Sequence, residues 1–205
     1  YASPMACSLA SHITALEAGL PVTIHYVNTT TKKTDAGADF RKIAPNGYVP
    51  ALKLPTGQIL NEGPSVLQYL ADQKPSAKLA PAWGTPERYQ LIDTLNYLST
   101  EVHKHLFHPI FAPSASEEAK AAAKAELAPT LDYMAKRLGN RDYLVGDSFT
   151  VADAYFVTLL NWFRYVGADL KRVPTIDAYH TRHLARPSVK QAMAKEMAER
   201  QKRAA

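Results

Sequence analysis

A proline-rich stretch divides this chain into two halves with different sequence patterns. Residues 75–86 contain Pro75, Pro81, Gly84 and Pro86, which is the composition of a linker. Strand-like and helix-like patterns follow one another before the stretch, whereas only helix-like patterns follow it. With 205 residues and 46% hydrophobic content, the chain can form two domains with a substantial core. We therefore expect a mixed α/β domain followed by an all-helical domain.

The N-terminal half predicts the element order of a thioredoxin-like domain. Its helices have apolar residues three and four apart, its first complete strand alternates apolar and polar residues, and Pro55-Thr56-Gly57 marks a hairpin turn. Only the end of an earlier strand is visible at Tyr1 and Ala2, so we expect the natural chain to begin a few residues earlier. The other expected elements are a helix at 8–20, a strand at 22–26, a short helix at 38–43, two strands within 49–60 and a helix at 63–73.

The C-terminal half predicts only helices. Thr150 can cap the helix that follows it, and Asp153 can reach back to complete a capping box. The domains are expected at residues 1–77 and 86–205, with a linker at 78–85. The helices are expected at 87–108, 116–138, 151–166, 175–184 and 188–203.

Composition argues against several classes of protein. A single cysteine cannot form an internal disulfide, and the first residues lack the basic and apolar regions of a signal peptide, so we expect a cytoplasmic protein. No apolar run is long enough to predict a membrane span. The net charge of +5 favours anionic small molecules, but Lys and Arg are scattered without interleaved aromatic residues, so nucleic acid is not expected. The basic tail at 190–205 is interpreted as a solvated helix end.

The only cysteine, Cys7, lies just before the first predicted helix. The N–H groups and the dipole of a helix N-terminus favour a thiolate and lower the pKa of a cysteine placed there. The two-cysteine redox motif would need a second cysteine three residues on, where the chain has Ala10. A lone activated thiol needs a second thiol from solution, and glutathione is the obvious one. The alternative is a buried, unreactive cysteine.

Two further segments of the N-terminal half suit a peptide-like ligand. In NGYVPAL, a cis bond before Pro50 would turn the backbone N–H and C=O of Val49 toward an extended peptide, whereas an ordinary trans proline would not. In NEGPS, the N–H groups of a helix that starts at Gly63 can hold a carboxylate while Glu62 pairs with an ammonium. Glu62 could instead only complement the helix dipole.

The first helix after the linker carries a polar face. Helical spacing places Asn96, Ser99, Thr100 and His103 on one side, where His103 could assist proton transfer. His103, His105 and His108 do not make this a metal site. Residues two apart on a helix diverge by about 200°, so only His105 and His108 share a face, and no further ligand has matching spacing.

The remaining candidate residues have simple interpretations. Lys32 or Lys33, in the loop TTTKKTDAG, could reach a substrate carboxylate, although surface lysines are common. Tyr155, Trp162 and Tyr165 recur at helical spacing, which favours packing over ligand binding.

Together these segments resemble the bacterial beta class of the cytosolic glutathione transferases, over essentially the whole chain. The most specific part is YASPMACSLASHITALEAGL, with the cysteine immediately before the first helix. NGYVPAL, NEGPSVLQYLADQKP and LNYLSTEVHK follow in the order and spacing of that class, and GDSFTVADAY resembles the capping segment of its helical domain. The implied fold is a thioredoxin-like α/β domain followed by an all-α domain, and the implied assembly is a homodimer.

The resemblance implies a role for each matching residue. Cys7 would approach the glutathione sulfur and form a mixed disulfide with it, while Asn96 and His103 would line the site nearby. Val49, before Pro50, would pair its backbone with the cysteinyl unit. The other glutathione-binding positions are Glu62 and Gly63 for the γ-glutamyl end, Lys32 for the glycyl carboxylate, Thr100 and Glu101, partly across the dimer interface, and Lys104, which follows the histidine as the class pattern expects.

Four positions depart from the patterns of these relatives. Met5 stands where Gly is usual and adds bulk beside the reactive loop, and Ala2 removes a usual Tyr hydroxyl that could activate the thiol. Ser11 stands where Pro is common, a change we expect to be mild. Gly63 replaces the Ser of the Glu-Ser pair found in the wider superfamily, but its backbone N–H can still bind a carboxylate.

The resemblance implies an enzyme that conjugates glutathione to small hydrophobic electrophiles, a detoxification chemistry, with the helical domain lining the electrophile pocket. Cys7 would add thiol-transferase or peroxidase activity, and no metal is implied. The alternative is a non-catalytic binding or regulatory protein of the same fold. Such a protein would be expected to lose Cys7, Glu62 or Lys32, and this chain keeps all three.

Overall fold

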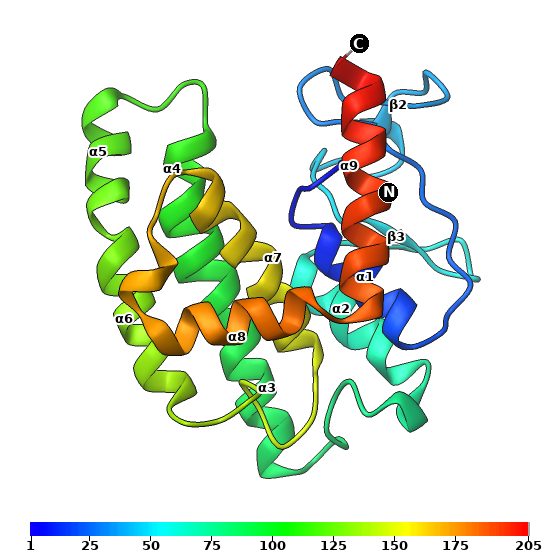
Figure 1. Ribbon diagram of the computed structural model, residues 1–205. Coiled ribbons are helices and arrows are strands. Elements are labelled where there is room, and N and C mark those ends of the chain that lie inside the picture. The colour runs from blue at the N-terminus through cyan, green and yellow to red at the C-terminus, as the bar shows by residue number, and fades with distance from the viewer. Residues whose placement is uncertain (205) are drawn as a thin grey trace. The chain divides into compact units, whose positions relative to one another are not determined.

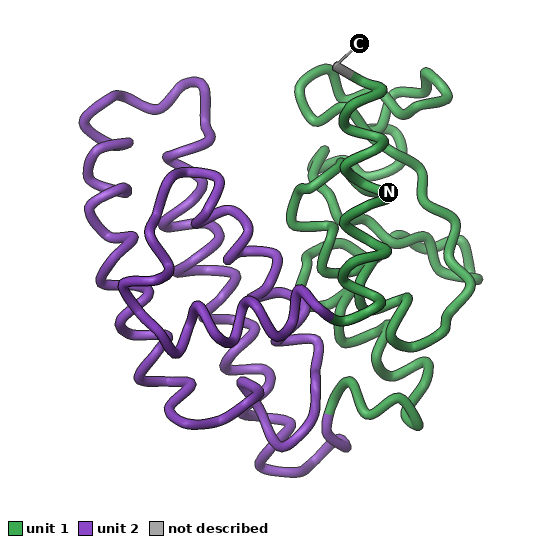
Figure 2. The backbone as a smooth tube through the Cα atoms, in the orientation of Figure 1, with its two compact units in different colours: residues 1–80, 186–205 green, residues 81–185 purple. Residues whose placement is uncertain are grey.

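The computed structural model describes residues 1–204, which form two compact units (Figure 2). Unit 1 contains residues 1–80 together with the chain from residue 186 onward, and unit 2 contains residues 81–185. The change of unit at residue 80 falls within the expected linker. The last helix, which the sequence pattern grouped with the helical half, is instead part of unit 1.

Unit 1 has the expected order of helices and short strands, with one further helix from the end of the chain (Figure 1). Its strands form two antiparallel pairs, with Val27 opposite Thr34 in one and Leu52 opposite Leu60 in the other. Helices α1 and α2 pack against each other. The elements are α1 (Leu9–Glu17), β1 (Val27–Asn28), β2 (Lys33–Thr34), the 3-10 helix η1 (Phe40–Lys42), β3 (Leu52–Lys53), β4 (Ile59–Leu60), α2 (Gly63–Asp72), the 3-10 helix η2 (Pro75–Ala77) and α9 (Pro187–Ala204).

The strand expected at 22–26 forms only at its end. Ala2 and Tyr26 make a parallel bridge, in which Ala2 N–H donates to the His25 carbonyl at 3.0 Å and the Ala2 carbonyl accepts from Val27 N–H at 2.8 Å. The amino group of Tyr1 turns away to the carbonyl of Ala51 at 2.8 Å. The ladder therefore does not continue along residues 22–24, and the expectation of a full strand there is wrong, because a strand forms only where a partner offers backbone groups.

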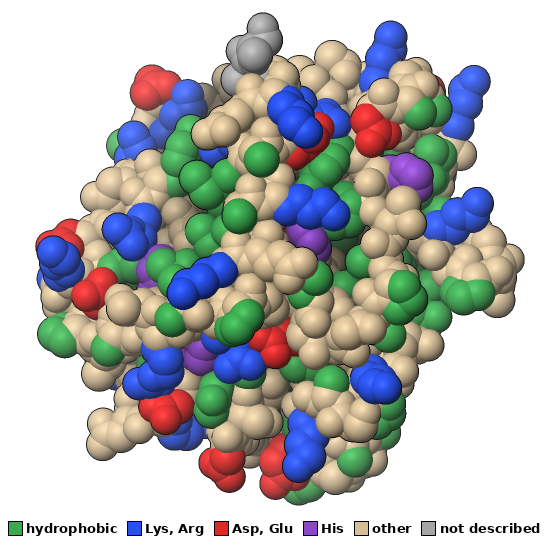
Figure 3. Space-filling view, turned by 45° about the vertical axis from the view of Figure 1, so that its right-hand side comes forward, with side chains coloured by type: hydrophobic (Ala, Val, Ile, Leu, Met, Phe, Trp, Pro, Cys, Tyr) green, Lys and Arg blue, Asp and Glu red, His purple; other side chains and the backbone are tan. Residues whose placement is uncertain are grey.

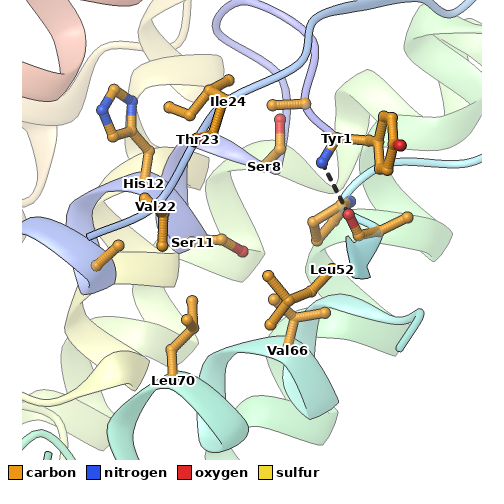
Figure 4. A pocket seen from close by; sticks show the side chains of 14 residues that line it. Tyr1, Ser8, Ser11, His12, Val22, Thr23, Ile24, Leu52, Val66 and Leu70 are labelled. Atoms are coloured by element: carbon orange, nitrogen blue, oxygen red, sulfur yellow. Dashed lines mark hydrogen bonds between the residues drawn. The ribbon is translucent and has the colours of Figure 1, made fainter. Parts of the chain in front are cut away.

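A small pocket of about 60 Å³ lies beside this unpaired segment (Figure 4). Its walls come from α1, α2 and residues 22–24 and 50–52. The hydroxyl of Ser11, one of the positions that departs from the family pattern, is buried there and has no hydrogen-bond partner within residues 1–204.

Helix α9 is anchored along α1 within unit 1 (Figure 1). The carboxylate of Glu17 on α1 accepts hydrogen bonds from Arg186 Nε at 2.8 Å and Nη2 at 2.9 Å, and from the Ser188 hydroxyl. Further along α9, the side chain of Glu196 is fully buried. The interpretation of residues 190–205 as only a solvated helix end is therefore wrong, because one face of this helix completes the core of unit 1.

Unit 2 is entirely helical, as expected (Figure 1). Its central helix is α7, in which nearly every side chain from Val151 to Leu160 is buried, so the other helices cover it on several sides. The elements are α3 (Pro86–Tyr97), the π-helix η3 (Leu98–Phe107), α4 (His108–Phe111), α5 (Glu117–Ala125), α6 (Leu127–Leu138), α7 (Val151–Tyr165), the 3-10 helix η4 (Leu170–Arg172) and α8 (Pro174–Leu184).

The capping box predicted at the start of α7 is confirmed. Asp153 is fully buried and accepts from Thr150 N–H at 2.8 Å, from the Thr150 hydroxyl at 3.0 Å, from Leu144 N–H at 2.8 Å and from the Tyr179 hydroxyl at 2.7 Å. Burial raises the pKa of Asp153, and these four hydrogen bonds oppose that shift. The box therefore joins the start of α7 to the preceding loop and to α8.

The surface in view carries mixed charge. Lys and Arg side chains lie among acidic and uncharged ones rather than in a single patch (Figure 3). The basic side chains on this face are therefore scattered. Among residues 1–204, no helix combines the length and apolar character needed to span a membrane.

Candidate functional site

Cys7 lies in the turns that lead into α1, as predicted. Ala6 N–H donates to the carbonyl of Ser3 at 3.1 Å, and Leu9 N–H, the first of the helix, donates to the Ala6 carbonyl at 3.0 Å. Cys7 is half-buried and not in a disulfide. Its Sγ donates a hydrogen bond to the carbonyl of Val49 at 3.2 Å. The fold therefore brings the cysteine to the segment that the sequence marked as a peptide-binding strand.

The peptide bond between Val49 and Pro50 is cis, which confirms the prediction. The Val49 side chain packs against the buried cluster of Val27, Phe40 and Ala51, while its carbonyl oxygen accepts from the Cys7 thiol. The backbone of Val49 is thereby held at the Cys7 sulfur.

Of the two candidate lysines, Lys32 is the one placed beside this segment. Its Nζ donates to the carbonyl of Gly47 at 2.9 Å and lies 5.2 Å from the centre of the Tyr48 ring, whereas Lys33 is exposed. Burial lowers the pKa of Lys32, and Arg41 lowers it further. The ammonium of Lys32 is therefore held close to Val49, where it could meet a carboxylate.

Glu62 has a strained backbone at the start of α2. Its φ of 66° lies in the left-handed region, which costs about 1–3 kcal/mol for a non-glycine residue and is concentrated at functional sites. Its side chain does not cap α2, which begins at Gly63. The carboxylate is therefore not used to complete the helix. Next to it, the buried Oδ1 of Asn61 has no hydrogen-bond partner among the residues that the structure describes, a feature that no sequence pattern indicated.

The polar face expected on the first helix of unit 2 falls largely on the π-helix η3. Thr100, Glu101, His103 and Lys104 lie within it, and Asn96 lies on α3 just before it. Because a π-helix bonds residue i to i+5, the expected α-helical spacing is wrong here, although the Thr100 hydroxyl still donates to the Asn96 carbonyl at 3.0 Å. All these residues except His103 are exposed. π-helical segments are frequent at functional sites.

His103 is held by a residue that the sequence interpretation assigned only to packing. Its Nδ1 lies 2.7 Å from the hydroxyl of Tyr155, and the Trp162 ring lies 5.1 Å from its own. Burial, followed by Lys104 and His108, lowers the pKa of His103 to about 4. The imidazole is therefore uncharged at neutral pH.

The other two aromatic residues predicted to pack, Trp162 and Tyr165, lie on α7. Trp162 packs among rings, and Tyr165, although 67% exposed, has its ring centroid 6.2 Å from that of Phe111. Across the described residues, no group of three His, Cys, Asp or Glu side chains could hold a metal ion.

Unit 1 holds its cysteine at a cis-proline, and the same chain carries an all-helical unit, which is the combination that the resemblance to the glutathione transferases implied. Two family models match this chain. "Glutathione S-transferase, N-terminal domain" matches residues 4–73, and "Glutathione S-transferase, C-terminal domain" matches residues 99–187. The chain therefore belongs to the glutathione S-transferase family.

Individual relatives indicate to which class of the glutathione S-transferase family the chain belongs. The chain is 39% identical to glutathione S-transferase GstA of Escherichia coli O157:H7, over 96% of this chain and 97% of that protein. A bacterial beta-class glutathione S-transferase from Sphingomonas chungbukensis superposes with a TM-score of 0.92 at 44% identity, covering 95% and 96% of the two chains. A sphingomonad glutathione S-transferase solved in complex with glutathione gives a TM-score of 0.91 at 44% identity with the same coverage. The chain is a glutathione S-transferase of the bacterial beta class, as the resemblance implied.

Proposed function

We propose that this transferase conjugates glutathione to small hydrophobic electrophiles and that Cys7 adds thiol–disulfide chemistry at the same site. The observation that carries the proposal is the hydrogen bond of 3.2 Å between Cys7 Sγ and the carbonyl of Val49, next to cis Pro50. A thiol peptide that pairs in extended form with Val49 would bring its own sulfur beside Cys7.

The charged ends of glutathione have matching partners in unit 1. The Glu62 carboxylate would pair with the ammonium of the γ-glutamyl end, and the N–H groups that start at Gly63 would bind its carboxylate. The half-buried Lys32 would take the glycyl carboxylate. The exposed residues of the π-helical region would supply further contacts, partly to glutathione on the partner in a cytoplasmic homodimer, and these residues are Asn96, Thr100, Glu101 and Lys104.

In conjugation, the glutathione thiolate attacks an electrophilic carbon, a C–S bond forms, and the leaving group departs with the electrons of its bond. The neutral His103 can act in either of two ways. If Tyr155 donates to Nδ1, then Nε2 carries the proton and can stabilise the thiolate by a hydrogen bond. In the other tautomer, Nε2 is free to accept the thiol proton.

In thiol transfer, the Cys7 thiolate attacks the glutathione sulfur of a mixed disulfide and expels the other sulfur as a thiolate, which takes a proton. A second glutathione thiolate then attacks the sulfur of the glutathione bound to Cys7. This step releases oxidised glutathione and restores the Cys7 thiolate, so the disulfide substrate is reduced and glutathione is oxidised. Hydroperoxides would enter the same cycle by oxidising Cys7 to a sulfenic acid, which glutathione converts to the mixed disulfide with loss of water.

Cys7→Ala tests whether Cys7 serves thiol transfer alone or conjugation as well. We expect thiol transfer from a glutathione mixed disulfide to fall at least about 100-fold, because the nucleophile is lost. Conjugation to a chlorinated dinitrobenzene should fall less than about tenfold, because glutathione supplies that nucleophile itself. Equal loss of both activities would mean that Cys7 also serves conjugation.

The glutathione assignment has a matched pair of variants. Lys32→Met should raise the KM for glutathione about tenfold, while Lys33→Met, one residue on, should leave it within about twofold. If the wild-type protein neither binds immobilised glutathione nor reacts with the dinitrobenzene, the proposed function is wrong and the binding-protein alternative is favoured.

A further inference from the structure

Two cations of unit 1 lie against Gly47, the residue two positions before Val49. A Cβ atom placed on Gly47 would lie 3.4 Å from Cδ of Lys32 and 3.6 Å from Cγ of Arg41. Gly47 itself is buried and has a φ of 65°, a conformation that glycine adopts freely. Because residue 47 carries no side chain, the stems of the two cations can pass close to each other there.

Neither cation is neutralised by a carboxylate. Among residues 1–204, no Asp or Glu side chain lies within ion-pair distance of Lys32 or Arg41. The Lys32 ammonium donates to the Gly47 carbonyl at 2.9 Å instead. Asp39, the acidic residue nearest to Arg41 along the chain, accepts from the backbone N–H of Arg41 at 3.0 Å.

The surroundings of Lys32 favour a bound anion over ordinary solvation. Burial lowers the pKa of Lys32, and the charge of Arg41 lowers it further. Like charges held together without a counter-charge disfavour each other's charged form, and a bound anion removes this penalty. Lys32 also has a left-handed backbone with a φ of 57°, a kind of strain that is concentrated at functional sites.

The two cations lie where the C-terminal end of an extended thiol peptide would arrive. Lys32 is bonded to Gly47, two residues before Val49, whose carbonyl accepts from the Cys7 thiol at 3.2 Å. An extended chain advances about 3.3–3.6 Å per residue. A peptide whose cysteinyl unit pairs antiparallel with Val49 would therefore bring the carboxylate of its next residue within reach of both cations.

We propose that Arg41 and Lys32 together bind the C-terminal carboxylate of glutathione and that Arg41 is a specificity-determining residue. The inference rests on the glutathione-binding function proposed above. The side chain of Arg41 is exposed, so its guanidinium can turn toward the ligand and hold a carboxylate by two parallel hydrogen bonds, whereas Lys32 acts as a point charge. The site then selects thiol peptides that have one residue after the cysteine and a free C-terminal carboxylate.

Calorimetric titration with glutathione and with its glycyl ethyl ester tests the proposal, because the ester lacks only the negative charge at that end. The wild type should bind the ester at least about tenfold more weakly than glutathione. Arg41→Met should weaken the binding of glutathione about fivefold to tenfold. It should change the affinity for the ester by less than about twofold, because the ester offers Arg41 no carboxylate.

Lys42→Met provides the matched control, because Lys42 is the next residue on η1 and is also exposed. It should leave both affinities within about twofold. Arg41→Lys, which keeps the charge without the planar fork, should recover part of the affinity that Arg41→Met loses. In conjugation assays, Arg41→Met should raise the KM for glutathione about fivefold to tenfold and leave kcat within about twofold, because this contact binds the ground state and the transition state equally.

Two results would overturn the proposal. One is an effect of Arg41→Met that is the same for glutathione and for the ester, including no effect on either. The other is an equal loss of glutathione affinity in Lys42→Met, which would show a general effect of surface charge. If the wild type binds neither ligand, the proposed function itself is wrong, whereas glutathione binding that does not depend on residue 41 removes only Arg41 from the site.

Discussion

At the scale of single residues, the protonation of His103 defines what it can do. Burial keeps its imidazole uncharged, with a pKa of about 4, and Tyr155 fixes its Nδ1. An uncharged imidazole can accept a proton or donate one hydrogen bond, but it cannot act as a cation toward a thiolate near neutral pH. Both roles proposed for it in conjugation meet this requirement.

The lowered pKa of His103 predicts a pH dependence of stability. Its ordinary pKa is about 6.5, so between about pH 6.5 and 4 the unfolded chain binds a proton that the folded chain does not. Stability is therefore lost as the pH falls through this window. Between about pH 7 and 5, the wild type should lose about 2 kcal/mol more than His103→Asn, measured by urea unfolding at each pH.

The comparison with the variant isolates this one group. His180, whose pKa is also lowered to about 4 by burial, and Asp153, whose pKa is raised, are present in both proteins and cancel in the difference. Parallel loss of stability in the wild type and the variant would show that His103 does not carry the lowered pKa.

How well single residues can be predicted depends on how local their partners are. Cys7 and Pro50 stand out because each occupies a recognisable place beside a helix or strand. Glu196 does not, since its partners Met5 and His12 lie 191 and 184 residues away along the chain. No window of sequence contains such a contact, and a glutamate in a basic tail is typical of a solvated helix.

At the scale of elements, α7 could be predicted from residues close together along the chain, whereas η3 could not. The capping box of α7 depends on residues three apart, so the sequence predicts it directly. In η3 the buried residues Leu98, Val102 and Leu106 are spaced four apart, which fits an α-helix as well as a π-helix. The apolar pattern therefore carries no sign of the change of hydrogen bonding there.

Removal of the buried carboxylate from the capping box should strongly lower the stability of the protein. Asp153→Ala should destabilise the protein by about 3–5 kcal/mol, because it leaves the buried donors of Leu144, Thr150 and Tyr179 without an acceptor. Thermal and urea unfolding measure the loss.

A surface cap provides the control for this prediction. Ser116 caps α5 by accepting from Ala119 N–H at 3.1 Å in an exposed position. Ser116→Ala should cost about 1 kcal/mol, the usual value for a cap. Equal losses for the two variants would mean that the wider network around Asp153 contributes nothing beyond capping.

At the scale of the whole molecule, unit 1 is built from both ends of the chain. The basic tail that forms most of α9 is typical of a solvated helix end, and its sequence does not show which helix it packs on. Because α9 follows the helices of unit 2 along the chain, the sequence pattern favoured grouping it with unit 2. The anchors that decide otherwise are side-chain contacts from Arg186, Ser188 and Glu196, which become visible only when the chain is folded.

This discontinuity predicts the effect of truncation. A chain that ends at Ala185 keeps every residue of unit 2 but loses the helix that completes unit 1. We expect it to retain a cooperative helical unfolding transition and to lose binding to immobilised glutathione, because the Cys7 loop and α1 then lack their cover.

A chain that ends at Arg200 keeps the contacts of Glu17 and Glu196 and loses the stacking of Arg203 on Tyr26 at 5.4 Å, so it should bind glutathione within about twofold of the full chain. Circular dichroism measures the helical unfolding transition of each truncated chain, and calorimetric titration measures its binding of glutathione. Glutathione affinity that survives in the shorter chain would show that unit 1 forms its site without α9, and the assignment of this helix to the glutathione-binding half would then have no functional meaning.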